Sequence, residues 1–310
     1  MGLRIWDLES PERKLGRPQA NLRYALSWKQ GAPIEIGTIK VLRVASGESA
    51  EAWRDALAKG DWLASSKVLK NDPEGGSWVR RAVIMGREVV VKCRMLNSLS
   101  RRLKHRIGMG HAHKQWRGAA RLLRAGITTG RPLAIGYASV DGVPRELLVL
   151  EFVEGRTLLQ LLDEIAGGIG PSVREQHAIA RAVGLSVPQM LRAHLRNRDH
   201  KPSNLIVVRS SDGLFRIALI DCVAVGRYGR DGLDFGEGEE MLASLMIEPI
   251  GCACAPRRAL WMRALRAWTD LADFNRARRH EALRTMLEEV TVAIRDHGDP
   301  RPKVDPLRGW

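Results

Sequence analysis

The hydrophobic pattern changes near residue 151 from mostly strand-like to mostly helical, and that change most limits the possible fold. From Ser65 to residue 150, apolar and β-branched runs such as "WVRRAVIM", "REVVVKCR" and "RELLVLEF" alternate with short turns, which is typical of antiparallel strands. From residue 151 onward, apolar residues mostly recur every three to four positions, which predicts helices. We therefore predict an α+β fold of two lobes. An antiparallel-sheet lobe occupies 65–150, a helical lobe occupies 151–310, and 1–64 form an extension whose role the sequence does not define.

Individual helices can be placed by their start and stop signals. "SAEAWRDALAKGDW" has helical spacing, with Ser49 as the expected N-cap and Gly60 as the stop. In the second half, "PSVREQHAIARAVG" and "PQMLRAHLRN" are predicted as two successive helices. Two strand-like runs follow, "NLIVV" and "FRIALIDCVAV", around a turn at 211–213.

Composition limits the partners and the compartment. Lys and Arg number 50 against 35 Asp and Glu, so the net charge of +15 favours an anionic partner. Two of the four cysteines, Cys93 and Cys222, lie in strand-like runs of a chain large enough for a full core, which favours a reducing compartment. The first residues contain no apolar run of signal-peptide length, and no stretch approaches the ~20 apolar residues of a membrane span. We expect a cytoplasmic protein that can associate peripherally with a membrane.

Four features occur in the order that phosphoryl transfer from ATP requires. That reaction needs phosphates held, magnesium placed and an acceptor hydroxyl oriented. Asp199 and Asn204 have the D-x-x-x-x-N spacing with Lys201 between them, and Asp221 ends the apolar run "IALI". Upstream lie a strand lysine in "VVVK" and a glycine-containing turn between strands: Lys92, Gly75, Gly76 and Ser77. Each feature alone is common, but their order predicts a kinase-like catalytic site.

These stretches resemble the bacterial lipopolysaccharide kinase family, which phosphorylates sugars such as Kdo or heptose. The resemblance rests on "REVVVKCR", "HKQWRGAARLLRAGITTGRPLAIG" and "RDHKPSNLIVV…IALIDC", and it covers roughly Lys67 to Asp221. It implies a protein-kinase-like fold. It also implies transfer of the γ-phosphate of ATP, with Mg²⁺, to a sugar hydroxyl of lipopolysaccharide or a related glycolipid, by a protein at the periphery of the inner membrane.

The resemblance also implies a role for each site residue. Lys92 would hold the α- and β-phosphates, and the turn at Gly75, Gly76 and Ser77 would cover them. Asp199 would orient the acceptor hydroxyl, and Lys201 would neutralise charge on the transferred group. Asn204 and Asp221 would bind magnesium. "LLVLEFVEGRTL" resembles the kinase hinge, so the main chain of Glu151, Phe152 and Val153 would line the adenine site.

The sequence departs from the kinase pattern in four places. Cys222 and Val223 follow Asp221 where kinases usually carry Phe-Gly. Gln115 stands where kinases carry the glutamate that pairs with the strand lysine, and an amide cannot neutralise Lys92. Asn197 precedes the catalytic pair where kinases usually have histidine, and no A-P-E signature follows Asp221. Two alternatives therefore stay open beside an active sugar kinase. One is a nucleotide-binding pseudokinase scaffold, and the other, which the missing A-P-E disfavours, is a protein kinase.

Residues 92–131 are strongly basic and contain no Asp or Glu. Such a run is either a solvated helix face with a loop or a docking surface for phosphorylated glycolipid or an anionic membrane. Nucleic acid is the least favoured partner, because Trp116 is the only aromatic residue in the run that could stack on bases. A metal site at the interleaved histidines is also disfavoured, because no acidic or cysteine ligand lies nearby. The basic residues are Lys92, Arg94, Arg101, Arg102, Lys104, Arg106, Lys114, Arg117, Arg121, Arg124 and Arg131.

Overall fold

The computed structural model describes residues 36–72, 76–140, 142–227, 235–271 and 275–297. By the contacts within it, the chain divides into two compact units. Among the described residues, the sheet unit contains 36–153 and 221–224, and the helical unit contains 154–220 and 225–297.

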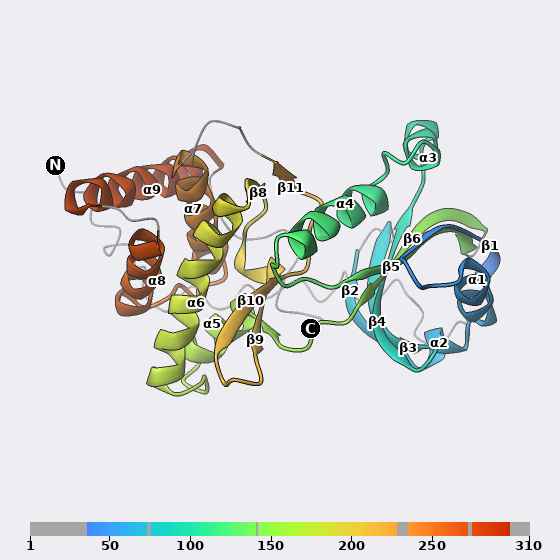
Figure 1. The fold of residues 1–310 in the computed structure, drawn as a ribbon, viewed down its shortest axis with the longest axis horizontal. Helices are drawn as coiled ribbons and strands as arrows, with labels where there is room; N and C mark the ends of the chain where they lie inside the picture. The colour runs from blue at the N-terminus through green and yellow to red at the C-terminus, as the bar shows by residue number, and fades with distance from the viewer. Residues whose placement is uncertain (1–35, 73–75, 141, 228–234, 272–274, 298–310) are drawn as a thin grey trace. The chain divides into compact units, whose positions relative to one another are not determined.

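A six-stranded antiparallel sheet forms the centre of the sheet unit (Figure 1). Its strands lie in the order β1-β5-β6-β4-β3-β2. This confirms the antiparallel sheet predicted from the alternating runs. The strands are β1 (Ile36–Val44), β2 (Lys67–Asn71), β3 (Ser77–Ile84), β4 (Arg87–Met95), β5 (Pro132–Val140) and β6 (Val143–Glu151).

Alternation along the strands gives the sheet two covered faces. Val89, Val91 and Cys93 of β4 point to a core that includes Trp53 and Trp62, which come from α1 (Ala50–Lys59) and α2 (Asp61–Ala64). Side chains on the opposite face, including those of Leu148 and Leu150, pack against α4 (His111–Arg124). The short helix α3 (Leu99–Arg106) connects β4 to α4 and packs little against the sheet (Figure 1).

The described part of the N-terminal segment, 36–64, belongs to the sheet unit. It supplies β1, α1 and α2. As predicted, α1 begins after Ser49, whose side chain accepts a hydrogen bond from the Ala52 N–H. It ends at Gly60, which has a φ of 72°.

The helical unit confirms the helix-rich second half. Its helices are α5 (Leu158–Ala166), α6 (Val173–Arg192), α7 (Phe235–Gly251), α8 (Arg258–Leu271) and α9 (Arg276–His297). Two small antiparallel sheets accompany them, in the orders β10-β9-β7 and β11-β8. The strands are β7 (Arg156–Thr157), β8 (Leu195–Asn197), β9 (Leu205–Arg209), β10 (Phe215–Leu219) and β11 (Val225–Arg227).

The prediction of two helices across 171–197 is wrong. One helix, α6, runs from Val173 to Arg192 with Pro188 inside it, and 195–197 form β8. Buried residues lie on both sides of the proline, including Val183, Val187 and Met190. Burial of this continuous apolar face outweighs the ~3 kcal/mol that an interior proline costs a helix.

No helix in the described part of the chain is long and apolar enough to cross a membrane.

Candidate active site

The strand lysine, Lys92, contacts Gln115, which stands where kinases carry a glutamate. Lys92 lies on β4, opposite Val79 on one side and Leu148 on the other. Its side chain points to the face that α4 covers, since Val91 and Cys93 point to the other. Lys92 Nζ donates to Gln115 Oε1 at 3.1 Å. The structure therefore brings these two predicted residues together through a neutral hydrogen-bond acceptor.

A buried carboxylate fixes the start of α4. Glu146 Oε2 lies 3.1 Å from His105 Nδ1 and 3.3 Å from the Ala112 N–H, which donates to it. Burial alone would raise the pKa of Glu146, but the hydrogen bonds from His105 and Ala112 outweigh it and hold that pKa below its usual range. A negative charge at a helix N-terminus is stabilising. Sequence reasoning missed this role of Glu146, because its partners lie 34 and 41 residues away.

A glycine lets the same helix approach the strand-end aspartate. A Cβ placed on Gly118 of α4 would lie 1.9 Å from the main-chain oxygen of Cys222, the residue after Asp221. Thr129 Oγ1 also contacts Cys222 Sγ at 3.3 Å. Burial raises the pKa of the Cys222 thiol to about 11, so it stays protonated. Asp221 thus lies in the sheet unit with Lys92 and Gln115. A glycine inside a helical pattern is the signal that could have indicated this contact.

His111, at the start of α4, also responds to Asp221. Burial lowers the pKa of His111, and the positive charge of Arg94 lowers it further, whereas the Asp221 carboxylate acts in the opposite direction. His111 is therefore neutral at physiological pH. The local sequence around this histidine indicates no such role.

The predicted phosphate turn lies between β2 and β3. Gly75 lies outside the described residues. Gly76 accepts a hydrogen bond from the Met95 N–H through its main-chain oxygen, and Ser77 begins β3, where its oxygen accepts from the Asp72 N–H. The described part of the turn is therefore tied to the end of β4, the strand of Lys92.

The predicted hinge follows β6. The Glu151 N–H donates to Arg131 O and the Phe152 N–H to Glu88 O. The Glu151 carboxylate pairs with Arg87 and Arg131, each at 3.0 Å. No described residue accepts a hydrogen bond from the Val153 N–H. Of the main-chain donors in this segment, that of Val153 is the one the geometry offers to a ligand.

The helical unit carries the predicted catalytic loop. Lys201 Nζ lies 3.2 Å from Asp199 Oδ1, and Asn204 Nδ2 donates to Asp199 Oδ2 at 2.8 Å. Asn197, the residue in place of histidine, is buried, and its Oδ1 accepts a hydrogen bond from the Asp199 N–H. The three predicted residues of this loop are thus brought together. Asn197 performs a positioning task that the sequence did not reveal.

A carboxylate from a distant helix holds the turn that presents Asn204. The 3₁₀ turn Pro202–Asn204 contains Ser203, whose N–H and Oγ donate to the two carboxylate oxygens of Glu248 at 2.8 and 2.7 Å. Glu248 lies on α7. On the other side, the Ile220 N–H donates to the Asn204 main-chain oxygen at 3.1 Å. Sequence reasoning missed Glu248, because nothing in its local pattern distinguishes it.

The donor atoms suit a small hard cation. Magnesium prefers oxygen ligands and binds through one or two carboxylates plus substrate phosphates. Asp221 offers a carboxylate, and the Asn204 amide nitrogen already donates to Asp199, which leaves its amide oxygen to face a cation. Asn204 lies in the helical unit and Asp221 in the sheet unit, so their joint role stays a prediction.

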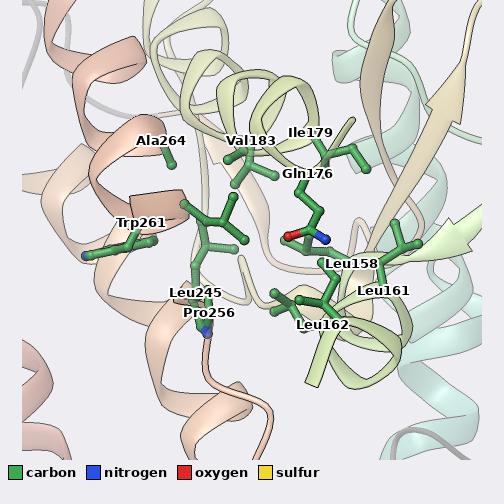
Figure 2. Close-up of a pocket in the computed structure, with 13 residues that line it drawn as sticks. Leu158, Leu161, Leu162, Gln176, Ile179, Val183, Leu245, Pro256, Trp261 and Ala264 are labelled. Atoms are coloured by element: carbon green, nitrogen blue, oxygen red, sulfur yellow. The ribbon is translucent and has the colours of Figure 1, made fainter. Parts of the chain in front are cut away.

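A separate apolar pocket lies within the helical unit (Figure 2). Its volume is about 50 Å³ and its walls come from α5 to α8. Leu158, Ile179 and Trp261 are typical of the lining, and the amide of Gln176 donates to the Pro171 main-chain oxygen. Benzene occupies a cavity of ~150 Å³ in a known engineered case, so this pocket is small for a ligand. Its lining also lacks the charged groups that a nucleotide requires.

Comparison with known proteins points to one family. Residues 63–223 match the family model described as "Lipopolysaccharide kinase (Kdo/WaaP) family", a range that includes all the predicted site residues. The solved structure of WaaP in complex with acyl carrier protein aligns with a TM-score of 0.50 at 23% identity, covering 73% of this chain and 88% of that one. WbdD aligns with a TM-score of 0.42 at 14% identity, covering 72% and 50%. No curated protein sequence matches the chain.

Proposed function

Because the chain belongs to the lipopolysaccharide kinase (Kdo/WaaP) family, we propose that it transfers the γ-phosphate of ATP to a sugar hydroxyl of lipopolysaccharide or a related glycolipid. Family membership makes the chain a kinase, a phosphotransferase, and supports a sugar as the acceptor class. ATP as the donor, the particular acceptor and a location at the cytoplasmic face of the inner membrane belong to the proposal.

The geometry around Asp199 is the observation that carries the proposal. Its carboxylate is oriented by Lys201 and Asn204, and its main chain by Asn197. A carboxylate held in this way can accept the hydrogen bond of an acceptor hydroxyl and take its proton as transfer proceeds. Lys201, at 3.2 Å from Asp199, would neutralise negative charge on the transferred group.

The sheet unit would hold the nucleotide, as the small lobe of a two-lobed kinase whose large lobe is the helical unit. Lys92, positioned by Gln115, would contact the α- and β-phosphates under the turn of Gly75, Gly76 and Ser77. The main chain at Glu151 and Val153 would line the adenine site. Asn204 and Asp221 would hold Mg²⁺, which when bound offsets charge on the β- and γ-phosphates.

The test is phosphoryl transfer by the full chain. The protein is incubated with labelled ATP, Mg²⁺ and dephosphorylated lipopolysaccharide, and label in the glycolipid is counted. Asp199→Asn should lower kcat by at least about 100-fold, since a positioned base contributes that much. Asp212→Asn, in the exposed turn between β9 and β10, is the matched control and should retain activity.

Two outcomes would contradict the proposal. One is equal transfer by the wild type and the Asp199→Asn variant. The other is binding of ATP, seen as a rise in melting temperature, without transfer to any glycolipid or sugar. The second outcome would favour a nucleotide-binding scaffold, and transfer to a generic peptide instead would favour a protein kinase.

A further inference from the structure

The residues from Leu99 to Met109 expose large apolar side chains. The exposed fractions are 82% for Leu99, 59% for Leu103, 58% for Ile107 and 54% for Met109. A single exposed leucine needs no explanation, but neighbouring ones mark interaction surfaces. These four follow one another along α3 and the turn after it, and together we call them the apolar stripe.

The apolar stripe faces away from the sheet unit. Leu99, Leu103 and Ile107 recur every four residues, which places them on one face of the helix. At ~100° per residue, His105 lies about 160° from the centre of that face. His105 is the buried residue of α3, and its Nδ1 contacts Glu146 Oε2 in the sheet unit. The contact between His105 and Glu146 fixes the orientation of α3, which leaves the apolar stripe exposed on the opposite side of the helix.

Positive charge flanks the stripe. Arg102, Lys104 and Arg106 are exposed and lie within about 100° of its centre around the helix axis, whereas the exposed Arg101 lies about 160° from it. Arg101 and Arg102 bond only to nearby groups, Asn97 Oδ1 and Leu96 O, among the contacts that the structure gives. No acidic residue occurs in the sequence between 92 and 131 to neutralise them. The chemistry complementary to this surface is apolar at its centre and anionic around it.

We propose that α3 and the turn after it form an interfacial anchor for an anionic phospholipid membrane. Helices that lie in a membrane surface combine leucine-type residues on one face with Lys and Arg beside them, because the former enter the acyl boundary and the latter contact headgroups. The apolar stripe enters the lipid, and Lys104 and Arg106 contact phosphates. The inference rests on the proposed function only in that a glycolipid acceptor lies at such a surface.

Sedimentation with lipid vesicles tests the proposed membrane anchor without a measurement of catalytic turnover. The full chain is mixed with vesicles of phosphatidylcholine, alone or with about one third phosphatidylglycerol. The wild type should bind the anionic vesicles. Leu99→Ser combined with Leu103→Ser should weaken that binding by about tenfold or more. The matched control, Ile169→Ser with Leu214→Ser, changes two equally exposed apolar residues of the helical unit and should bind as the wild type does.

A second pair of variants tests the charges. Lys104→Glu with Arg106→Glu should also weaken binding to anionic vesicles, whereas Lys59→Glu with Lys67→Glu, which changes net charge equally at other exposed positions, should weaken it less. All variants should keep the wild-type melting temperature, because the substituted side chains are exposed.

Three outcomes would contradict the proposal that α3 is a membrane anchor. The first is wild-type vesicle binding by the double-serine stripe variant. The second is equal wild-type binding to vesicles with and without the anionic lipid. The third is self-association of the wild type that the double-serine stripe variant loses while its vesicle binding is unchanged. The apolar stripe would then be an interface between two copies of the chain. Transfer of phosphate to a soluble sugar acceptor is measured separately, so failure of the anchor and failure of the kinase proposal are distinguishable.

Discussion

Gln115 is the residue at which this chain departs most from the usual kinase site. It is buried, and its Oε1 accepts from Lys92 at 3.1 Å. We predict that Gln115→Leu lowers kcat/KM for ATP by about ten- to a hundredfold, because a hydrogen bond to a charged group contributes ~1.5–3 kcal/mol. Gln115→Glu restores an acceptor and should retain activity. Steady-state kinetics at varied ATP checks both, and full activity of the leucine variant would show that Gln115 does not position Lys92.

Glu248 is a positioning residue, since it acts through Ser203 on the turn that presents Asn204. Glu248→Gln replaces one of the two acceptor oxygens by a donor, so a partly buried hydrogen bond of Ser203 is lost. We predict a loss of about 1–3 kcal/mol in the free energy of unfolding and a fall in kcat with little change in KM for ATP. Urea unfolding and kinetics measure the two effects.

The control for Glu248 is Glu281→Gln, which removes an exposed ion pair with Arg278. Exposed pairs contribute ~0–1 kcal/mol, so this variant should be close to wild type. Similar losses in the two variants would mean that charge, and not the Ser203 contact, explains the effect.

The site residues differ in how far sequence could identify them. Asp199, Lys201 and Asn204 lie within six positions, and their spacing, together with the order of the strand lysine before them and Asp221 after them, predicted a shared site. Glu248 could not be predicted, because it contacts a turn 45 residues earlier through tertiary packing. Local spacing therefore predicted which groups could carry the chemistry but not those that hold them in place.

At the level of elements, α4 connects the lysine and the strand-end aspartate, and Gly118 makes this possible. We predict that Gly118→Ala destabilises the protein by several kcal/mol. The helix gains ~1 kcal/mol from alanine, but the new Cβ would lie 1.9 Å from Cys222 O, which is main chain and cannot move cheaply. Gly226→Ala, at a glycine with no atom within 4 Å of the added Cβ, should change stability little. Denaturant midpoints compare the two, and equal midpoints would contradict the close approach.

Sequence reasoning missed or mispredicted three elements, each for a different physical reason. β8 has three residues and pairs with β11 about thirty residues later, so no local periodicity indicates it. The apolar face of α3 points to solvent, whereas sequence patterns identify a helix by an apolar face that packs on the core. α6 continues through Pro188 because tertiary burial overrides a local stop signal.

At the scale of the whole molecule, His200 couples stability to pH. His200 follows Asp199 in the sequence, and its side chain is fully buried. Neither of its ring nitrogens has a hydrogen-bond partner among the described residues. Burial lowers the pKa of His200 from 6.5 to about 4. The folded protein therefore holds this imidazole neutral at a pH where the unfolded chain would protonate it.

The unfolded chain binds this proton first as pH falls, so the contribution of His200 to stability is complete above pH 6.5 and is lost from 6.5 toward 4. Each pH unit in that window should lower the free energy of unfolding by about 1.4 kcal/mol through this residue. His111 and His113, whose pKa values burial also lowers, act in the same direction, so some pH dependence remains in any single variant. We predict that His200→Leu flattens the slope between pH 6.5 and 5, measured by urea unfolding at several pH values, whereas His280→Gln, at an exposed position, keeps the wild-type slope. An unchanged slope in the leucine variant would mean that His200 is protonated or hydrated in the folded protein.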